Sequence, residues 1–128
     1  MKTIINSDQA PKPIGPYSHA NLVATGGNML FVSGQVAKDA HTGELYTQDI
    51  KSETTKVMEN ILAILKEADM EFKHVVKTSI FMKDLNDFGA MNDIYSQYFP
   101  DNYPARETVQ VSRLPLDVNV EISVIAVK

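Results

Sequence analysis

Apolar residues recur every three or four positions over Asp49–Ala68, and neither glycine nor proline interrupts the segment. This spacing predicts a long amphipathic helix, because side chains three and four positions apart share one helical face. A second apolar stripe predicts a second helix, and its members are Phe88, Met91, Tyr95 and Tyr98. This helix ends before Pro100, because a proline ring does not continue a helix.

Segments rich in β-branched residues or alternating in polarity predict strands. They are Thr3–Ile5, which is short, Asn21–Thr25, Met29–Val36, Val75–Met82, Glu107–Val111 and Val118–Val127. Gly26-Gly27-Asn28 predicts a tight turn that joins the second and third strands in a hairpin, since its glycines accept positive φ. A turn around Arg113-Leu114-Pro115 predicts another hairpin between the last two strands. The order of strands and helices is that of an α+β fold.

The last predicted strand has two unlike faces. Its even-numbered residues from Val118 to Ala126 are all apolar and are expected to lie under the two helices. The opposite face begins with polar residues yet ends with Ile125 and Val127, which helices on the far side do not cover. A second subunit is the simplest cover, and it would place the polar half of this face in a cleft between subunits.

The composition is that of an ordinary globular protein, since the 128 residues are 44% hydrophobic and 22% charged. This length fits a single domain over residues 1–128. Sixteen acidic residues against twelve basic ones give a net charge of −4, so duplex nucleic acid is not an expected partner. The sequence shows no secretory or membrane-spanning apolar run, so a cytoplasmic location without membrane contact is expected.

The chain contains no cysteine, which excludes disulfides, thiolate nucleophiles and sulfur-ligated metals. The histidines at 19, 41 and 74 form no i, i+4 pair, so no metal site is indicated. Ser33-Gly34 lacks the flanking glycines of a hydrolase elbow, and its glycine favours a β-bulge slightly over the close approach of a ligand. Gly26-Gly27 precedes a strand rather than a helix, so no nucleotide cofactor is expected there.

An arginine and a glutamate on the last two strands form the candidate reactive pair. If Val109 and Val111 face the helices, alternation turns Arg106 and Thr108 to the same face as Glu121. A hairpin that pairs Thr108 with Glu121 makes Arg106 and Glu121 diagonal neighbours roughly 7–8 Å apart at the backbone, and a slip by two residues fits the pattern equally. Such a pair is usually a plain ion pair; alternatively, Arg106 binds a substrate carboxylate while Glu121 positions or deprotonates water.

Short strings along the whole chain carry a family resemblance. They are Ile14-Gly15-Pro16-Tyr17-Ser18, Phe31-Val32-Ser33-Gly34-Gln35, Asn86-Asp87-Phe88 with Asn92, Pro104-Ala105-Arg106, and Arg113-Leu114-Pro115 with Val120-Glu121-Ile122. Together, in this order and spacing, they resemble the Rid family of reactive-intermediate deaminases, also called RidA/YjgF. The resemblance implies a chorismate-mutase-like fold with a mixed six-stranded sheet, two helices on one face, and a homotrimer around a central β-barrel.

The resemblance also implies hydrolysis of 2-imino or 2-aminoacrylate-type acids to the 2-oxo acid and ammonia, with no cofactor and no metal. By position, Arg106 resembles the catalytic residue that clamps the substrate carboxylate, and Glu121 resembles the one that orders the attacking water. The other implied substrate-binding residues are Tyr17, Ser33, Gly34 and Asn92, together with Thr108, which replaces a cysteine common in relatives.

Two departures from the family pattern bear on substrate range rather than on reaction type. Leu116 stands where relatives often carry a basic residue, and Glu107, unusual beside Arg106, is expected toward the helices or the strand edge. Two other functions stay open. A non-catalytic trimer that senses a small carboxylate would need the same arginine, so the sequence does not separate it from a deaminase. An RNA-cleaving activity fits poorly with the net charge of −4.

Overall fold

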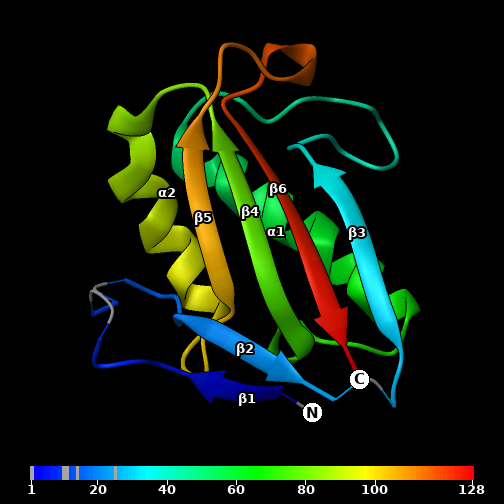
Figure 1. Cartoon of the computed structure of the whole chain (residues 1–128). Coiled ribbons are helices and arrows are strands. Elements are labelled where there is room, and N and C mark those ends of the chain that lie inside the picture. The colour runs from blue at the N-terminus through cyan, green and yellow to red at the C-terminus, as the bar shows by residue number, and fades with distance from the viewer. Residues whose placement is uncertain (1, 10–11, 14, 25) are drawn as a thin grey trace.

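The structure, a computed structural model of the chain, describes residues 2–9, 12–13, 15–24 and 26–128. Its strands are β1 (Lys2–Ile5), β2 (Ala20–Val23), β3 (Met29–Gln35), β4 (Val75–Met82), β5 (Ala105–Gln110) and β6 (Val120–Val127), and its helices are α1 (Ile50–Glu67) and α2 (Phe88–Tyr95). Figure 1 shows β3 to β6 as one sheet with both helices behind it. All the predicted elements are therefore present, although Ile14 and Thr25, which belong to two of the predictions, lie outside the described residues.

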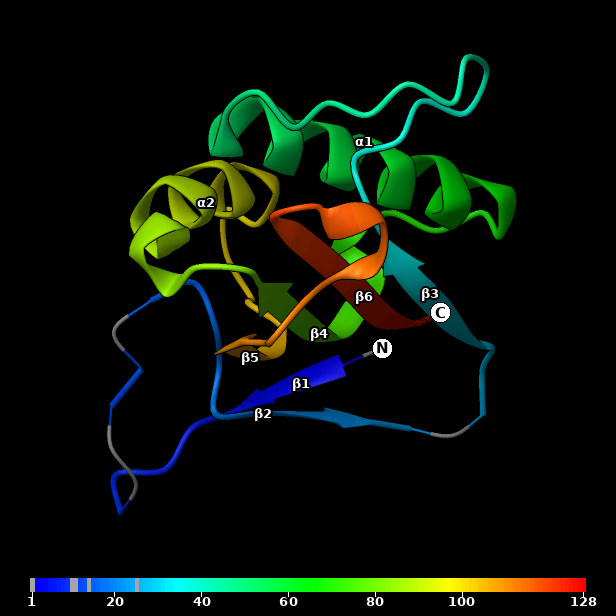
Figure 2. The ribbon, with the colours of Figure 1, turned by 90° about the horizontal axis from the view of Figure 1, so that it is seen from above.

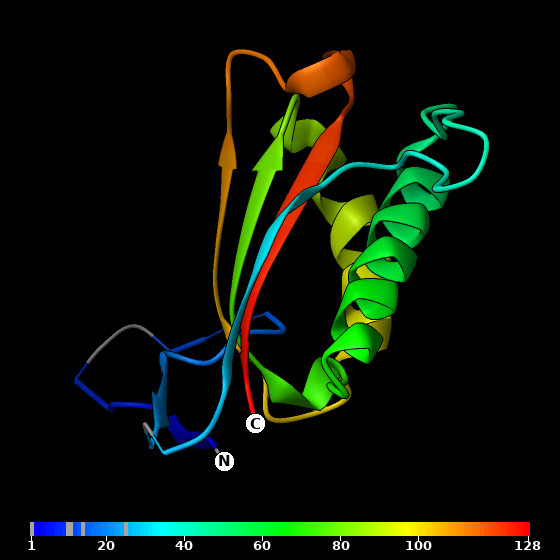
Figure 3. The same ribbon diagram turned by 90° about the vertical axis from the view of Figure 1, so that its right-hand side faces the viewer.

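The six strands form two sheets rather than one. Four of them make a mixed sheet in the order β3-β6-β4-β5, and β1 and β2 make a separate antiparallel pair. Figure 3 shows this pair at the lower end of the larger sheet, on the side opposite the helices. The α+β class with two helices on one face is confirmed, and the expectation of a single six-stranded sheet is corrected to two sheets.

The predicted hairpin between β2 and β3 does not form. β2 pairs with β1, and β3 pairs with β6, so the connection between them joins the two sheets. The turn instead meets the C-terminal residue, because Asn28 and Lys128 exchange two backbone hydrogen bonds of 2.8 and 3.0 Å. Gly27 permits this approach, since a side chain there would come within 2.5 Å of the Lys128 carbonyl oxygen.

The predicted hairpin between β5 and β6 does not form either. β5 lies parallel to β4 at the sheet edge, and β6 lies antiparallel to β4 on its other side (Figure 1). The reason is α2, which connects β4 to β5, because a helical crossover between neighbouring strands makes them parallel. The chain must then pass over the end of β4 to reach β6, and a 3-10 turn at Pro115–Asp117 lies in this connection.

The core lies between the four-stranded sheet and the two helices, which Figure 2 shows from above. α1 begins at Asp49, whose side chain accepts a hydrogen bond of 2.8 Å from the Ser52 amide and so caps the helix. Its buried stripe, which includes Val57, Ile61 and Leu65, packs on the apolar face of β6. The buried residues of that strand include Val120, Ile122, Val124 and Ala126, so the face predicted to lie under the helices is confirmed.

The other face of the sheet, which we call the open face, carries exposed apolar side chains. Phe31 on β3 is 68% exposed, Met29 is 48% exposed, and Val109 on β5 is 42% exposed. Phe31 lies beside Ile125 of β6 in the antiparallel register. A group of apolar side chains on a sheet face is typical of an interaction surface. The predicted apolar surface opposite the helices is therefore present, and it reaches both edges of the sheet. The prediction is wrong for Val127, which is 5% exposed and so is already buried within one chain.

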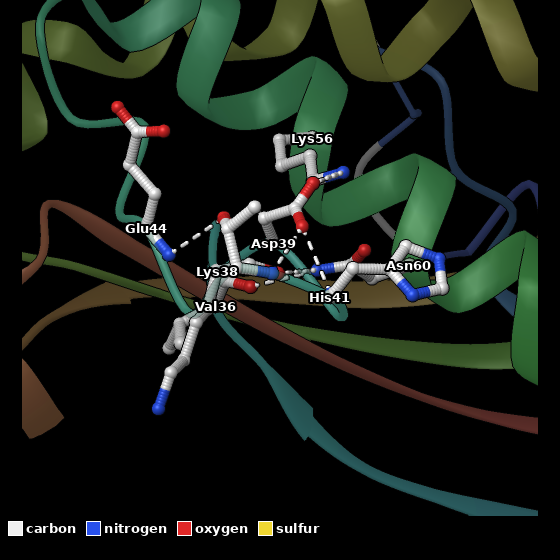
Figure 4. A network of polar contacts seen from close by, with 8 residues as sticks. Val36, Lys38, Asp39, His41, Glu44, Lys56 and Asn60 are labelled. Atoms are coloured by element: carbon white, nitrogen blue, oxygen red, sulfur yellow. Dashed lines mark hydrogen bonds and ion pairs between the residues drawn. The ribbon is translucent and has the colours of Figure 1, made fainter.

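A polar network holds the long connection between β3 and α1 (Figure 4). The Asp39 carboxylate accepts hydrogen bonds from the backbone amides of His41 at 2.9 Å and Thr42 at 2.8 Å. Its second oxygen lies 3.4 Å from the Lys56 ammonium on α1. Asn60, also on α1, donates to two carbonyls of the connection at 3.1 and 3.0 Å. These contacts hold the connection against α1.

Asp39→Asn tests this network through its dependence on pH. The amides of Thr42 and His41, and then Lys56, hold the pKa of Asp39 well below its ordinary value. The unfolded chain therefore takes up a proton at this position first, so the contribution of Asp39 to stability is present above about pH 4 and is lost as the pH falls through the lower folded pKa. Urea unfolding should show wild-type stability falling more steeply than that of D39N between about pH 4 and pH 2. Parallel curves for the two proteins would show that the charge of the Asp39 carboxylate does not stabilise the fold.

Candidate functional site

Arg106 lies on the helix side of β5, at the edge of the sheet. Its partner in the parallel register is Thr78 of β4, which is fully buried, and residues at the same level of neighbouring strands share a face. The prediction that Arg106 and Thr108 turn away from the helices is therefore wrong. Val109 lies on the open face instead. Alternation misassigned this strand because the open face is also apolar, so a valine does not mark the helix side.

Aromatic rings surround the Arg106 guanidinium. Its central carbon lies 5.0 Å from the centre of the Tyr95 ring, 5.6 Å from that of Phe88 and 5.9 Å from that of Tyr17. Its Nη1 donates a hydrogen bond of 2.7 Å to Oδ1 of Asn92, a neutral amide. Among the described residues, no carboxylate lies within ion-pair distance of this guanidinium. The cation therefore has aromatic and neutral partners in its own chain.

Burial affects both ionisable groups at the centre of this cluster. It lowers the pKa of Arg106, although Tyr95 and Tyr17 raise that pKa, and a guanidinium keeps its proton in proteins. Burial also raises the pKa of Tyr95 to about 12, although the hydrogen bond of 3.0 Å from its hydroxyl to Thr78 Oγ1 acts in the other direction. At neutral pH the cluster is thus a partly buried cation on neutral rings, an environment that favours an anionic ligand.

Thr108 contributes a hydroxyl to the same face of β5. It follows Arg106 by two positions, and its Oγ1 is buried without a hydrogen-bond partner in the part of the chain that the structure describes. Buried hydroxyls are normally satisfied by protein or by ordered water. Thr108 is therefore a candidate contact for a ligand or a water molecule bound near Arg106.

The segment over residues 15–18 brings Tyr17 to the guanidinium. Ser18 anchors it, because its backbone amide and its hydroxyl donate to two carbonyls just before β5, at 3.2 and 2.6 Å. Gly15 passes close to the arginine, and a side chain there would already lie 3.6 Å from Arg106 Nη2. We call Tyr17, Asn92, Arg106 and Thr108 the arginine half-site.

Glu121 lies on the open face and leans over β3. The register between β3 and β6 shifts between Val32 and Gln35, which confirms the β-bulge predicted at Ser33-Gly34. A side chain at Gly34 would come within 2.5 Å of Glu121 Oε2, so the glycine also permits a close approach, here by a side chain of the same chain. We call Ser33, Gly34 and Glu121 the glutamate half-site.

The two half-sites lie on opposite faces and near opposite edges of the sheet. Arg106 is on the edge strand β5, and Glu121 is two strands away beside the other edge strand, β3. The registers of both strands with β4 place their Cα atoms roughly 14 Å apart, with side chains pointing to opposite sides. The predicted diagonal contact within one chain is therefore wrong, because it depended on a β5–β6 hairpin. A head-to-tail ring of subunits can bring one chain's arginine half-site to another chain's glutamate half-site.

Glu107 also lies elsewhere than predicted. It shares the open face with Ser79, its partner in the parallel register, instead of turning to the helices or the strand edge. Its carboxylate accepts a hydrogen bond of 2.5 Å from Ser79 and lies 2.8 Å from the Lys77 ammonium. Lys77, followed by Ser79, lowers the pKa of Glu107. This acid is therefore paired on the open face and is no competitor for Arg106.

Two residues of the arginine cluster, Phe88 and Tyr95, are not among those predicted for the site. The sequence assigns Tyr95 to the core alone, yet its ring also lies under the guanidinium. Phe88, Asn92 and Tyr95 are spaced by four and three positions on α2 and so share one helical face. The sequence signal for this cluster is Asn92, an amide within the apolar stripe of α2, because a buried amide needs a polar partner. Arg106 is that partner.

Two of the three histidine side chains, those of His19 and His74, accept hydrogen bonds from nearby backbone amides. Nδ1 of His19 and Nδ1 of His74 each accept a hydrogen bond of 2.9 Å, from the backbone amides of Ser7 and Glu71. Within the described ranges, no group of three or more metal-ligating side chains is arranged to hold a metal ion. No helix in those ranges is long and apolar enough to cross a membrane.

Known proteins match this chain from end to end. The profile of the family described as Endoribonuclease L-PSP matches residues 7–128. A RutC family protein of Pyrococcus abyssi is 52% identical over 127 residues, which are 99% of this chain and 98% of that protein. The structure of YyfA from Yersinia pestis, of the conserved Rid protein family, matches with a TM-score of 0.77 and 41% identity over 100% of both chains. The chain belongs to the RidA/YjgF (Rid) family.

A human relative of this Rid protein has a name that states an activity. It is the 2-iminobutanoate/2-iminopropanoate deaminase, which is 38% identical over 128 residues, covering 100% of this chain and 91% of the human protein. The aligned region includes the positions of both half-sites, because the match spans the whole chain. The family predicted from the short sequence strings is therefore confirmed.

Gly34→Ala tests the geometry of the glutamate half-site in this Rid protein. The added methyl group would overlap the Glu121 carboxylate, which is the flexible end of a side chain, so we expect the carboxylate to move off β3 while the fold persists. Because Gly34 is exposed, the free energy of unfolding should change by only about 0.5 kcal/mol. A crystal structure of G34A with Glu121 unmoved would contradict this account.

Gly89→Ala is the matched control for that substitution. A side chain at Gly89 meets nothing within 4 Å, and the residue lies on α2. Alanine is a better helix former than glycine, so G89A should be more stable by about 0.5–1 kcal/mol. Its Glu121 carboxylate should stay over Gly34.

Proposed function

We propose that this Rid protein hydrolyses 2-imino acids, and the 2-aminoacrylate-type enamines that convert to them, to 2-oxo acids and ammonia. The observation that carries the proposal is the partly buried Arg106 guanidinium, whose partners in the described chain are three rings and a neutral amide. A charge withdrawn from water without an opposite charge is unfavourable, so this site gains free energy when an anion binds. A carboxylate suits it well, because two oxygens match the parallel N–H groups of a guanidinium.

Binding of the carboxylate places the adjacent C2 atom for attack by water. A protonated imine is already electrophilic, so a positioned water and a proton acceptor suffice for the reaction. Glu121 accepts a proton from the water as the water oxygen bonds to C2, and Glu121 then passes the proton to the nitrogen. The C2–N bond then breaks while the C2 hydroxyl gives its remaining proton to Glu121, which leaves the 2-oxo acid. The departing ammonia takes that proton from Glu121 and leaves as ammonium. General acid–base help of this kind contributes about 10²–10⁴-fold to the rate.

The site is proposed to form between the protomers of a homotrimer. One chain does not supply both halves to one ligand, because Arg106 and Glu121 lie on opposite faces of its sheet. The open face supplies the apolar surface that an interface requires, with Phe31 68% exposed beside the glutamate half-site. In a closed ring, each arginine half-site meets the next protomer's glutamate half-site and none is left over.

Two comparisons bear on the choice of reaction. The name of the human relative supports deamination of 2-imino acids by a chain that is 38% identical to this one. The family description names an endoribonuclease, yet a net charge of −4 gives little attraction to RNA phosphates. A sensor that binds the same acids without hydrolysing them would use the same arginine, so binding and turnover must be measured separately.

Arg106→Lys tests the carboxylate clamp. Lysine keeps the positive charge but lacks the planar pair of donors, so the affinity for 2-oxobutanoate should fall at least about 10-fold. Ammonia release from 2-iminobutanoate, generated in the assay by a threonine dehydratase, should fall by a similar factor. Calorimetry and ammonia detection provide the two readouts. Unchanged affinity in R106K would rule out the clamp, and wild-type binding without ammonia release would identify the sensor.

Mixed trimers test whether the site is shared. R106A lacks the clamp and E121Q lacks the proton acceptor, so each protein alone should be nearly inactive. If the halves come from different protomers, joint refolding of equal amounts restores both residues at about one interface in four, and about a quarter of wild-type ammonia release should return. The same two proteins mixed without subunit exchange are the control. No recovery after exchange would mean that neighbouring chains do not complete one another's sites.

A further inference from the structure

The first turn of α1 carries a fully buried carboxylate, Glu53. Its Oε2 accepts hydrogen bonds from the backbone amides of Asn119 at 2.8 Å and Val120 at 3.2 Å, and its Oε1 accepts one from Asn119 Nδ2 at 2.7 Å. No basic side chain of the described ranges forms an ion pair with it. All three donors belong to the two residues directly before Glu121. The buried carboxylate of Glu53 therefore binds the backbone at the start of β6.

These two residues end a strained connection. Leu116 and Asp117, with φ of 59° and 54°, are consecutive non-glycine residues in the left-handed region, which side chains disfavour. Leu116 is 58% exposed, so core packing does not hold it in this conformation. The end of the connection is held by Glu53, by the Lys83 amide, which donates to the Asn119 carbonyl at 3.0 Å, and by the Lys83 ammonium, which lies 3.2 Å from the Asp117 carboxylate. Val118 is fully buried as well. Among these contacts, those of Glu53 act on the two residues directly before Glu121, so their loss would allow the start of β6 to shift.

We propose that Glu53 is a positioning residue for the hydrolysis. It fixes the backbone of Asn119 and Val120 from the helix side, while the Glu121 side chain leaves the opposite side of β6 and lies over Gly34. A displacement of about 1 Å in a group that holds a reactant can lower a rate about 100-fold. The inference rests on the proposed role of Glu121 and adds a residue that touches no substrate.

Three variants separate positioning from packing. Glu53→Leu removes all three acceptor contacts. Glu53→Gln keeps one oxygen for the two backbone amides, and its NH₂ group can donate to the Asn119 side chain once that amide turns over. Thr54→Val is the matched control, because Thr54 is equally buried on α1 and its hydroxyl donates within the helix, to the Ile50 carbonyl at 2.7 Å.

We expect E53L to lower kcat for ammonia release roughly 10- to 100-fold. Its affinity for 2-oxobutanoate should change less than about 3-fold, because the arginine half-site is intact. E53Q and T54V should keep kcat within about 3-fold of wild type, whatever their melting temperatures. Equal kcat losses in E53L and T54V, or equal losses of kcat and affinity in E53L, would overturn the proposal. Should E53L not fold, Asn119→Ala removes one donor and should lower kcat alone.

The carbon-13 carboxyl signal of Glu121 tests the same inference without turnover. The signal is assigned by its loss in Glu121→Gln. It should keep its wild-type position in E53Q and T54V and should move or split in E53L. An unmoved signal in E53L would contradict the positioning role. A wild-type protein that releases no ammonia would contradict the proposed function instead, and the carboxyl signals would still decide the role of Glu53.

Discussion

The Arg106 guanidinium is partly withdrawn from water between the edge strand β5 and helix α2, where it contacts aromatic rings and donates to the neutral amide of Asn92. These contacts offset only part of the lost hydration of a full charge. The cluster therefore holds the cation in place, and an anion that binds there would offset the rest of the lost hydration. The surrounding elements serve this end, because α2 supplies Phe88 and Asn92 while the anchored segment before β2 supplies Tyr17.

The topology explains why one chain carries two separated half-sites. The β4–α2–β5 crossover places Arg106 under the helix at one edge of the sheet, and β6 enters on the other side of β4, where Glu121 faces away from the helices. The sheet thus separates the proposed carboxylate-binding group from the proposed proton acceptor. The proposed homotrimer would join the two groups across the open face. Glu53 links the two faces, since it acts from the helix layer on the backbone that carries Glu121.

Sequence periodicity predicts the bounds and the buried face of an element well when one face packs in the apolar core and the other does not. β4 has the predicted bounds of Val75–Met82, and α1 lies within the predicted Asp49–Ala68, because both bury a continuous apolar stripe in one core. The alternation of β6 is read correctly for the same reason. On β5 the polarity of the residues does not identify the helix side, because Val109 is apolar and lies on the open face, while Arg106 is charged and lies among aromatic rings. The polarity of its residues identifies the buried face of a strand only when the other face is polar. It does not distinguish two faces that both carry apolar residues.

The local sequence pattern does not predict how the strands pair or which residues surround Arg106. Sequence neighbours in a strand-turn-strand pattern are expected to pair, yet the helix between β4 and β5 makes those strands partners and leaves β6 to enter elsewhere. The resemblance named Tyr17, Asn92 and Arg106 without their geometry, and the structure brings these three together. Phe88 and Tyr95 join them only when α2 is seen packed on the sheet.

A crystal structure of the protein with 2-oxobutanoate bound tests the central claim most directly. The account predicts the keto acid between two protomers, with both carboxylate oxygens on the guanidinium of Arg106 from one chain and the C2 carbonyl beside Glu121 from its neighbour. A keto acid bound away from Arg106, or an assembly in which the two half-sites do not meet, would contradict it.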